Sequence, residues 1–275
     1  MDEREEQEGN QRPMTVEVLI QRLFRDPRYM LIGKTERLGR ELLSFIESCT
    51  LLSATGDMKG QLLLNNEYEL RGRPDGERPY GHESLLDYHL DRRGEKLSLS
   101  DEDLSALRDE SWLYYVRRNF HFLLEDWAAG RDDAEHNLGL WHLVEQSDAG
   151  EAAKWGYLKW WPWMERDRAI GQAMWYLAHD QPDQAAAELY RGERAIEQFG
   201  ERYREQYAQE ESDGRDLCTH MAHHLGALAE LLRRDSNLPV SLDERLAEAE
   251  SRGDAEEVER LRTEMIRRAM EEGEP

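Results

Sequence analysis

The chain has 275 residues, enough for one large domain or two modest ones with a real core. Hydrophobic residues make up 39% of it, including eight Trp and eleven Tyr, so most of the chain is expected to fold. The formal net charge of −23 disfavours direct binding to nucleic acid or to an anionic membrane, because a phosphate surface repels such a chain unless basic residues cluster locally.

The first residues and the cysteines indicate a cellular compartment. Residues 1–13 are predicted to be a disordered acidic tail, whereas a signal peptide needs a basic start and an apolar run. No apolar stretch approaches membrane-spanning length. The only cysteines, Cys49 and Cys218, form no CxxC pair and are expected to be idle thiols. We therefore expect a cytoplasmic protein in a reducing environment.

Residues 14–95 are predicted to be a small α+β segment. The stretch Glu67 to Leu70 alternates polar and apolar residues with the period of a strand. Thr15 is a candidate N-cap before the first apolar pattern, and Pro27 follows the end of that pattern. Helical spacing of apolar residues predicts two helices, one containing Val16, Leu19, Ile20 and Leu23 and one containing Leu38, Leu42, Phe45 and Ile46.

The stretch GRPDGERPYGHES, residues 72–84, is rich in Gly and Pro and is predicted to be an ordered turn or loop. Arginines in it could bind a carboxylate or phosphate through paired hydrogen bonds, which makes it a candidate site for an anion or a peptide terminus. Alternatively, Arg73 and Asp75 only hold the turn. His82 or Ser84 is expected to begin the next helix. The candidate residues are Arg73, Asp75, Arg78 and His82.

Residues 98–236 are predicted to be a body of helical repeats. Ser100, followed three residues later by Asp103, resembles a capping box at the start of a long helix. Small residues at Ala173, Ala185 and Gly192 are spaced as in a tetratricopeptide unit, where they let two helices approach closely. Further helices are expected at about 132–146, 150–161, 165–179, 183–207 and 215–234.

A poorer copy of the same repeat pattern begins at about Asn119, and Arg118 stands there where a small residue belongs. Beyond it lies a tryptophan-rich stretch that could line an aromatic groove for a peptide or a flat ligand, or simply fill the space between helices. Because adjacent Trp160 and Trp161 cannot share one helix face, at least one of them is expected to be exposed or at an interface. The tryptophans concerned are Trp155, Trp160, Trp161, Trp163 and Trp175.

A histidine cluster near Cys218 is the only pattern with metal-ligand spacing. His220 shares a helix face with His223 and His224, a spacing that can bind zinc. Met221 and Ala222 occupy the positions where a metalloprotease motif needs an acidic residue, and no further ligand is identifiable. We therefore predict no metal, no cofactor and no catalytic residues.

Residues 240–272 are predicted to be a helical hairpin that follows a linker at Pro239. Each of its helices has one narrow apolar stripe, and a Gly-Asp break separates the two helices. Such a hairpin buries too little to be stable alone, so it should dock on a partner, dimerise or pack on its own body. The stripe consists of Leu242, Leu246, Ala249, Val258, Leu261 and Met265.

This hairpin resembles the UVR motif, which ends the B and C subunits of the bacterial excision nuclease and also occurs in activators of arginine kinases and Clp-type unfoldases. Leu242 and Leu246 match the first helix of that motif, whereas Ala255 departs from it because the motif has an aromatic residue there. The resemblance and the apolar stripe together predict a docking module, and we expect a partner to be bound through Leu242, Leu246, Ala249, Val258, Leu261, Arg262 and Met265.

The stretch GRPDGERPYGHESLLDY is similar to a segment of UVR-motif proteins of planctomycete-type bacteria. In those proteins a strand leads into a Gly-Arg-Pro-Asp-Gly turn, and helical repeats and the terminal motif follow. The resemblance implies an architecture and no chemistry. The expected fold is mainly α, with a small N-terminal α+β segment, a tetratricopeptide-like helical repeat body and a C-terminal UVR-like helical hairpin.

The expected function is that of a non-enzymatic adaptor that docks a partner protein through the hairpin. Residues 241–275 hold twelve acidic and six basic groups, so a partner with a basic rim around an apolar groove fits best. One alternative is an accessory factor of nucleotide excision repair that binds an excision nuclease subunit. A second alternative is a metal-dependent hydrolase that uses the histidine cluster or the Arg-rich loop.

Overall fold

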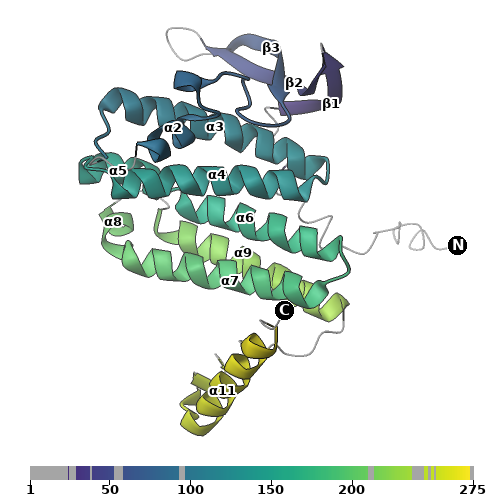
Figure 1. Ribbon diagram of the computed structural model, residues 1–275, viewed down its shortest axis with the longest axis vertical. Helices are drawn as coiled ribbons and strands as arrows, with labels where there is room; N and C mark the ends of the chain where they lie inside the picture. Colours follow the sequence, from purple (N-terminus) through teal and green to yellow (C-terminus); the bar gives the residue numbers. More distant parts are fainter. Residues whose placement is uncertain are drawn as a thin grey trace, which may run out of the picture.

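The computed structural model describes residues 24, 29–37, 39–52, 58–92, 97–209, 214–236, 245–246, 249–250 and 252–272. In Figure 1 a small sheet lies at one end of a stack of helices, and a helical hairpin lies beyond the other end. The prediction of a mainly α fold with strands near the N-terminus is confirmed.

The sheet is antiparallel and has the order β1-β2-β3. Its strands are β1 (Tyr29–Arg37), β2 (Arg40–Leu52) and β3 (Met58–Glu69). Leu43 pairs with Tyr68 of β3, and Arg37 pairs with Arg40 across the tight turn at Gly39, whose φ is +75°. The residues from Glu67 onward, whose alternation predicted a strand, lie at the end of β3.

The helix predicted from Leu38 to Ile46 is wrong, because most of that stretch is strand β2. Leu43 and Phe45 are two residues apart and therefore share one face of the strand. Both are buried and pack against Val116 and Phe120 of the long helix α3 (Asp101–Leu123). Because the four consecutive residues 42–45 are all buried, their pattern fits the helix period and the strand period equally well. Packing against α3 decides in favour of the strand.

Two predicted helix starts are confirmed. Ser84 begins α2 (Leu85–Asp91), where its hydroxyl oxygen accepts a 3.0 Å hydrogen bond from the Asp87 amide. Ser100 begins α3 with a full capping box. Its hydroxyl oxygen accepts from the Asp103 amide at 3.1 Å, and its own amide donates to the Asp103 carboxylate at 2.9 Å. A short 3₁₀ turn, η1 (Pro79–Gly81), precedes α2.

The helices that follow stack in chain order, with α3 against α4, α4 against α6, α6 against α7 and α7 against α9 (Figure 1). The predicted helices are present, although the one expected at 183–207 is divided at Tyr203. Within the described residues, no helix is both long and apolar enough to cross a membrane. The bounds are α4 (Trp127–Gln146), α5 (Glu151–Leu158), α6 (Trp161–Leu177), α7 (Pro182–Arg202), α8 (Arg204–Gln209) and α9 (Gly214–Asp235).

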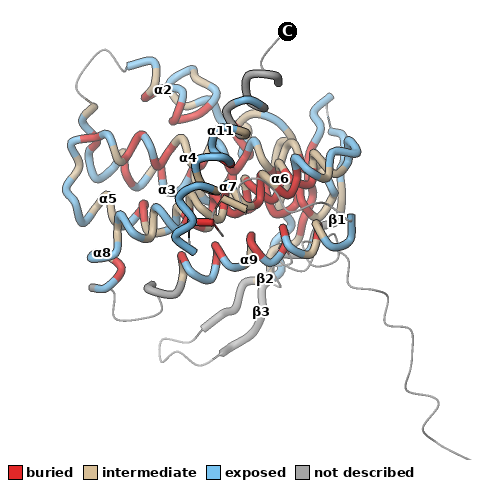
Figure 2. Tube along the Cα trace, turned by 90° about the horizontal axis from the view of Figure 1, so that it is seen from below, coloured by how far each residue is buried: buried red, intermediate tan, exposed pale blue. Residues whose placement is uncertain are grey.

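Buried residues lie on the inner faces of these helices, and exposed residues lie outside (Figure 2). The largest apolar cluster joins α6, α7 and α9. A Cβ added to Gly192 of α7 would lie 2.7 Å from the Cβ of Ala169 and 2.8 Å from Cδ1 of Leu225. The close approach of these three helices therefore depends on the missing side chain. Phe24 joins the same cluster and contacts Phe122, with ring centres 4.3 Å apart.

The hairpin contains helical residues at 245–246 and 249–250 and the helix α11 (Ala255–Glu272). Several predictions fall outside the described residues, namely the tail at 1–13, the helix from Val16 to Leu23, the linker at Pro239 and the position of Leu242. Met265 belongs to α11, but its side chain is not described.

Candidate functional site

The glycine-rich loop is an ordered turn, as predicted. The amide of Glu69 donates to the carbonyl oxygen of Pro74 at 2.7 Å, and the amide of Gly76 donates to that of Arg73 at 2.9 Å. Gly72 and Gly76 have φ values of +68° and +75°, which residues with a side chain rarely adopt. The loop conformation therefore requires both glycines.

Arg73 lies beneath this loop rather than on its surface, because only 8% of it is exposed. Its Nη2 atom is 3.4 Å from the Asp75 carboxylate, and its Nε atom is 3.4 Å from the carboxylate of Glu110 on α3. Asp75 also accepts a 3.0 Å hydrogen bond from the amide of Glu77. Arg73 and Asp75 thus meet as predicted, and both also hold the loop in place.

Glu110 is a fully buried carboxylate at the centre of this region. It accepts hydrogen bonds from the amides of Leu85 and Leu86 at 2.8 and 3.2 Å and lies 3.1 Å from Nε2 of His136 on α4. Burial raises the pKa of Glu110, but these hydrogen bonds outweigh burial, so the pKa is below its ordinary value. The Glu110 carboxylate therefore connects the start of α2, helix α4 and, through Arg73, the loop.

Arg117 fastens the loop from the same side. It donates two hydrogen bonds to Asp133 of α4, at 2.9 and 2.6 Å, in the paired geometry that arginine forms with carboxylates. Its remaining Nη1 atom donates to the carbonyl oxygens of Glu69 and Gly72 at 2.9 and 2.7 Å. One arginine of α3 thus holds both the loop backbone and the next helix.

The other two loop candidates lie apart from this cluster. Arg78 is half-exposed, and its Nη2 atom is 3.8 Å from the Glu69 carboxylate. His82 has its Nδ1 atom 3.5 Å from the carboxylate of Asp91 at the end of α2. Each of the two therefore faces a carboxylate of the chain itself, and binding of an anion or peptide by this loop stays a prediction.

A second buried ionic group joins α3 to α6. Arg118 and Asp167 are both fully buried, with Nη2 and Oδ2 2.7 Å apart. Arg166 donates to the other oxygen of Asp167 at 2.8 and 2.5 Å. Arg118 occupies the place where the repeat pattern has a small residue, and the structure shows why an arginine fits there. It pairs with an acid on the facing helix.

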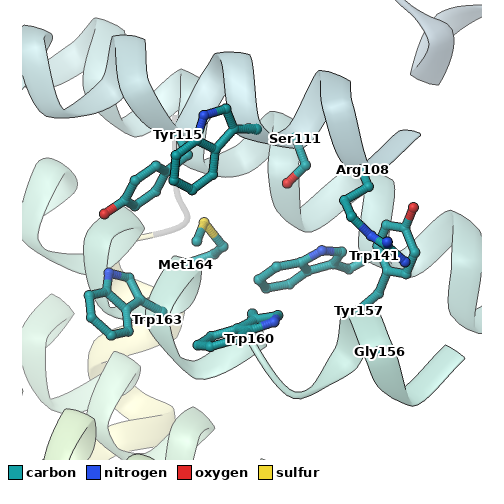
Figure 3. Close-up of a pocket in the computed structure, with 10 residues that line it drawn as sticks. Arg108, Ser111, Tyr115, Trp141, Gly156, Tyr157, Trp160, Trp163 and Met164 are labelled. Carbon is teal, nitrogen blue, oxygen red and sulfur yellow. The ribbon is translucent and has the colours of Figure 1, made fainter. Parts of the chain in front are cut away.

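An aromatic pocket lies between α3, α4, α5 and the start of α6, with a cavity volume of about 360 Å³. Figure 3 shows Arg108 and Tyr157 at one end of it, Tyr115 and Trp163 at the other, and Met164 between them. Six aromatic side chains line the pocket, namely Trp112, Tyr115, Trp141, Tyr157, Trp160 and Trp163.

The tryptophan-rich stretch contributes only part of this lining. Trp160 is 48% exposed, which confirms that one of the adjacent pair Trp160 and Trp161 reaches the surface. Trp163 also lines the pocket, whereas the other three tryptophans of the stretch pack elsewhere. Trp161 stacks on Phe199 at 4.6 Å between ring centres, Trp155 meets Tyr207 at 4.7 Å, and Trp175 meets His179 at 4.0 Å.

The half of the pocket that α3 and α4 provide was not predicted from the sequence. Arg108, Trp112 and Tyr115 are four and three residues apart, so they share one face of α3. That spacing was a usable signal. Trp141 carried no such signal, because its position depends on how α4 packs against α6.

The histidine cluster lies on α9. The rings of His220 and His224 are 4.1 Å apart, while Cys218 is buried, and burial raises the pKa of its thiol. Burial likewise lowers the pKa of His224, aided by the neighbouring His220. Within the part of the chain that the structure describes, no group of three or more His, Cys, Asp or Glu side chains could hold a metal ion.

Ion pairs connect the two arms of the C-terminal hairpin. Arg245 lies 3.3 Å from Glu257, and Arg262 lies 2.8 Å from Glu250. Each pair joins a residue of the first arm to a residue of α11 twelve positions further along the chain. Ala249 is fully buried, so the two arms pack against each other at this point.

The predicted apolar stripe divides into an inner and an outer part. Ala249 and Leu261 are fully buried, whereas Leu246 and Val258 are half-buried and Arg262 is exposed. Because α11 lies away from the stacked helices in Figure 1, the two buried residues serve the packing of the hairpin itself. Leu246 and Val258 remain available at its surface.

No family model matches the chain, and no curated protein or solved structure matches it either. We therefore infer its function from the residues and geometry described above.

Proposed function

We propose that the chain is a non-enzymatic cytoplasmic adaptor that binds a partner protein through its C-terminal hairpin. The observation that carries this proposal is the position of the hairpin, which lies away from the helical stack in Figure 1. The helices of the stack bury their apolar faces against one another. The polar contacts of Arg245 and Arg262, in contrast, stay within the hairpin.

The hairpin surface supports docking. A hairpin this small cannot bury enough apolar area to be stable alone, so additional contact area has to come from outside. Ala249 and Leu261 already form its interior. Leu246 and Val258 are half-buried, and they are the side chains that we assign to the partner contact, together with the exposed Arg262. Met265 and Leu242 complete the stripe that the UVR-like motif implies.

Charge supports a partner of a different kind rather than a second copy. Residues 241–275 hold twelve acidic and six basic groups, so two hairpins repel each other at low salt. A partner with a basic rim around an apolar groove is instead attracted to the hairpin. We propose a partner protein of that chemistry.

The stack supports the role of a scaffold with tetratricopeptide-like repeats. Helices α4, α6, α7 and α9 pack in chain order, as repeats do. Ala169 and Gly192 meet where α6 and α7 approach closely, and Ala173 and Ala185 are both buried. We infer that the repeats display the hairpin at one end of the scaffold.

The test replaces surface residues of the hairpin in the full-length protein. Leu246→Asp and Val258→Asp each place a charge in the proposed contact, so partner binding should weaken by at least about tenfold. Thr263→Asp adds the same charge at an exposed position of α11 and is the matched control. The partner is recovered by affinity capture, purified, and titrated against all three variants and the wild type.

Three results would contradict the proposal. Equal affinities of Val258→Asp and Thr263→Asp would show that the stripe does not bind the partner. A wild-type dimer that the Val258→Asp variant loses in sedimentation would show that the hairpin pairs with itself. A chain truncated after Leu238 should keep the thermal stability of the body, and collapse of that chain would show that the hairpin is part of the core. Recovery of an excision nuclease subunit would assign the adaptor to DNA repair.

A further inference from the structure

The aromatic pocket carries an inference that does not depend on the hairpin. Its cavity volume of about 360 Å³ falls within the range typical of ligand sites. It therefore has room for a small organic ligand. Trp141, Trp160 and Met164 all line the pocket (Figure 3), so a flat group could lie among apolar side chains.

The exposed tryptophans of the helical body are concentrated at this pocket. In the described residues from 97 to 236, the only large apolar side chains classed as exposed are Trp112 at 46% and Trp160 at 48%. Both line the pocket, although Trp112 belongs to α3 and Trp160 lies directly before α6. Indole rings left in water are unfavourable, and two of them at the rim of one cavity indicate that a ligand covers them.

Arg108 supplies a positive charge at one end of the pocket. Its guanidinium carbon is 5.5 Å from the centre of the Tyr157 ring, and no ion pair joins Arg108 to a carboxylate in the described part of the chain. Arg118, behind the pocket, is instead neutralised by Asp167 at 2.7 Å. Lys159 adds a second cation near the rim, with Nζ 5.6 Å from the Trp160 ring centre.

We propose that this pocket binds a small aromatic carboxylic acid. The ring lies among Trp141, Trp160 and Met164, and the carboxylate pairs with Arg108. An apolar cavity with a cation at one end selects for an apolar body that carries a negative group. The ligand is therefore of the size and class of an indole or naphthalene acetate.

Gly156 provides a variant that fills the pocket without disturbing the fold. It lies in α5 and lines the cavity, and a Cβ added there would meet no atom within 4 Å. Gly156→Leu should therefore occupy the ligand space, while the melting temperature stays the same or rises, because glycine weakens a helix interior. Gly156→Ala is the matched control that leaves the cavity open.

The experiment is calorimetric titration of the full-length protein with indole-3-acetate and with the uncharged indole-3-acetamide. The acid should bind at least about tenfold more tightly than the amide, because a hydrogen bond to a charged group has that effect. Arg108→Gln should remove this preference, whereas Arg204→Gln, at an exposed arginine of α8, should keep it. Gly156→Leu should abolish binding of both ligands, and Gly156→Ala should retain it.

Each opposite result would overturn the proposal. Equal affinity of the wild type for acid and amide would remove the role of Arg108. Binding by a folded Gly156→Leu variant as strong as that of Gly156→Ala would place the ligand elsewhere. Absence of binding by indole-3-acetate and naphthalene-1-acetate at millimolar concentration would exclude this ligand class.

Discussion

Helices α3 and α7 both lie inside the stack, but they bury different chemistry. The inner face of α7 consists of small and aliphatic residues such as Ala185, Leu189 and Ile196, with Glu188 as its buried charge. The inner face of α3 instead includes the charged side chains Glu110, Arg117 and Arg118. The reason is that α7 packs on other helices, whereas α3 also holds a loop and joins α2, α4 and α6 through its polar side chains.

The two helices therefore specify the fold in different ways. Apolar faces stabilise in proportion to buried area, and they tolerate small shifts at modest cost. A buried ion pair contributes little net stability when complete, but losing one partner leaves an uncompensated charge in the interior. Substitutions on α3 should therefore have larger effects than substitutions of comparable size on α7.

The largest effect is expected for the acid that pairs with α3. Asp167→Ala leaves Arg118 and Arg166 as buried cations without their carboxylate, which should cost about 3–5 kcal/mol of unfolding free energy. Urea denaturation measures this loss, with the exposed Glu201→Ala as control. A loss below about 1 kcal/mol would show that the interior tolerates the unpaired arginines.

A smaller, pH-dependent effect is expected at the centre of the loop cluster. Glu110→Gln removes charged hydrogen bonds, which should cost about 1.5–3 kcal/mol at neutral pH. Because the pKa of Glu110 in the folded protein is below its ordinary value of 4.5, its stabilisation is present above pH 4.5 and is lost as the pH falls through the lower folded pKa.

Denaturation at a series of pH values therefore shows whether a loss of stability in Glu110→Gln comes from the lost charge or from the changed shape of the side chain. The difference in unfolding free energy between wild type and Glu110→Gln should be constant above pH 4.5 and narrow in more acidic solution. A difference that stays the same throughout would mean that shape rather than charge is responsible.

A similar or smaller loss of stability is expected for a substitution in the apolar contact between α6 and α7. Gly192→Ala forces a methyl group to within 2.7 Å of the Ala169 Cβ, so α6 and α7 must separate, and the cost should be about 1–3 kcal/mol less the gain in helix propensity. Gly156→Ala, where the added Cβ has open space, should be neutral or stabilising. If both variants behave alike, the close approach at Gly192 does not limit packing.

The smallest effect is expected in the glycine-rich loop. Asp75→Ala removes the acceptor for the Glu77 amide and one partner of Arg73, which should cost about 1 kcal/mol. Asp75→Asn keeps an acceptor oxygen and should recover part of that loss. The thermal midpoint measures both, and an unchanged midpoint in Asp75→Ala would show that the other contacts of the loop hold it without Asp75.

The same contrast explains which parts of the fold could be predicted from the sequence. The apolar spacing along α7 and α9 follows the helix period closely, and local signals at Ser84 and Ser100 locate two helix starts. Buried charges interrupt that spacing on α3, so neither Glu110 nor Arg118 was expected in the core. Ionic partners far apart in the sequence leave no local signal.

The predictions for strand β2 and for the aromatic pocket were wrong or incomplete for a related reason. Leu42 to Ile46 fits either period, and only contact with Val116 and Phe120 decides between them. For the pocket, the tryptophan-rich stretch identified Trp160 and Trp163, but the side chains from α3 and α4 meet them only after the helices stack. The sequence therefore indicated one wall of the site, and tertiary packing supplied the other.

The packing of β2 on α3 has a consequence for synthesis of the chain. Leu43 and Phe45 leave the ribosome well before Val116 and Phe120, which later cover them. At roughly 5–20 residues per second, the strands wait several seconds with their apolar face open. Unpaired strand edges are prone to join other chains during such an interval. The nascent sheet is therefore prone to aggregate during synthesis, and slowing translation between residues 70 and 115 should increase aggregation.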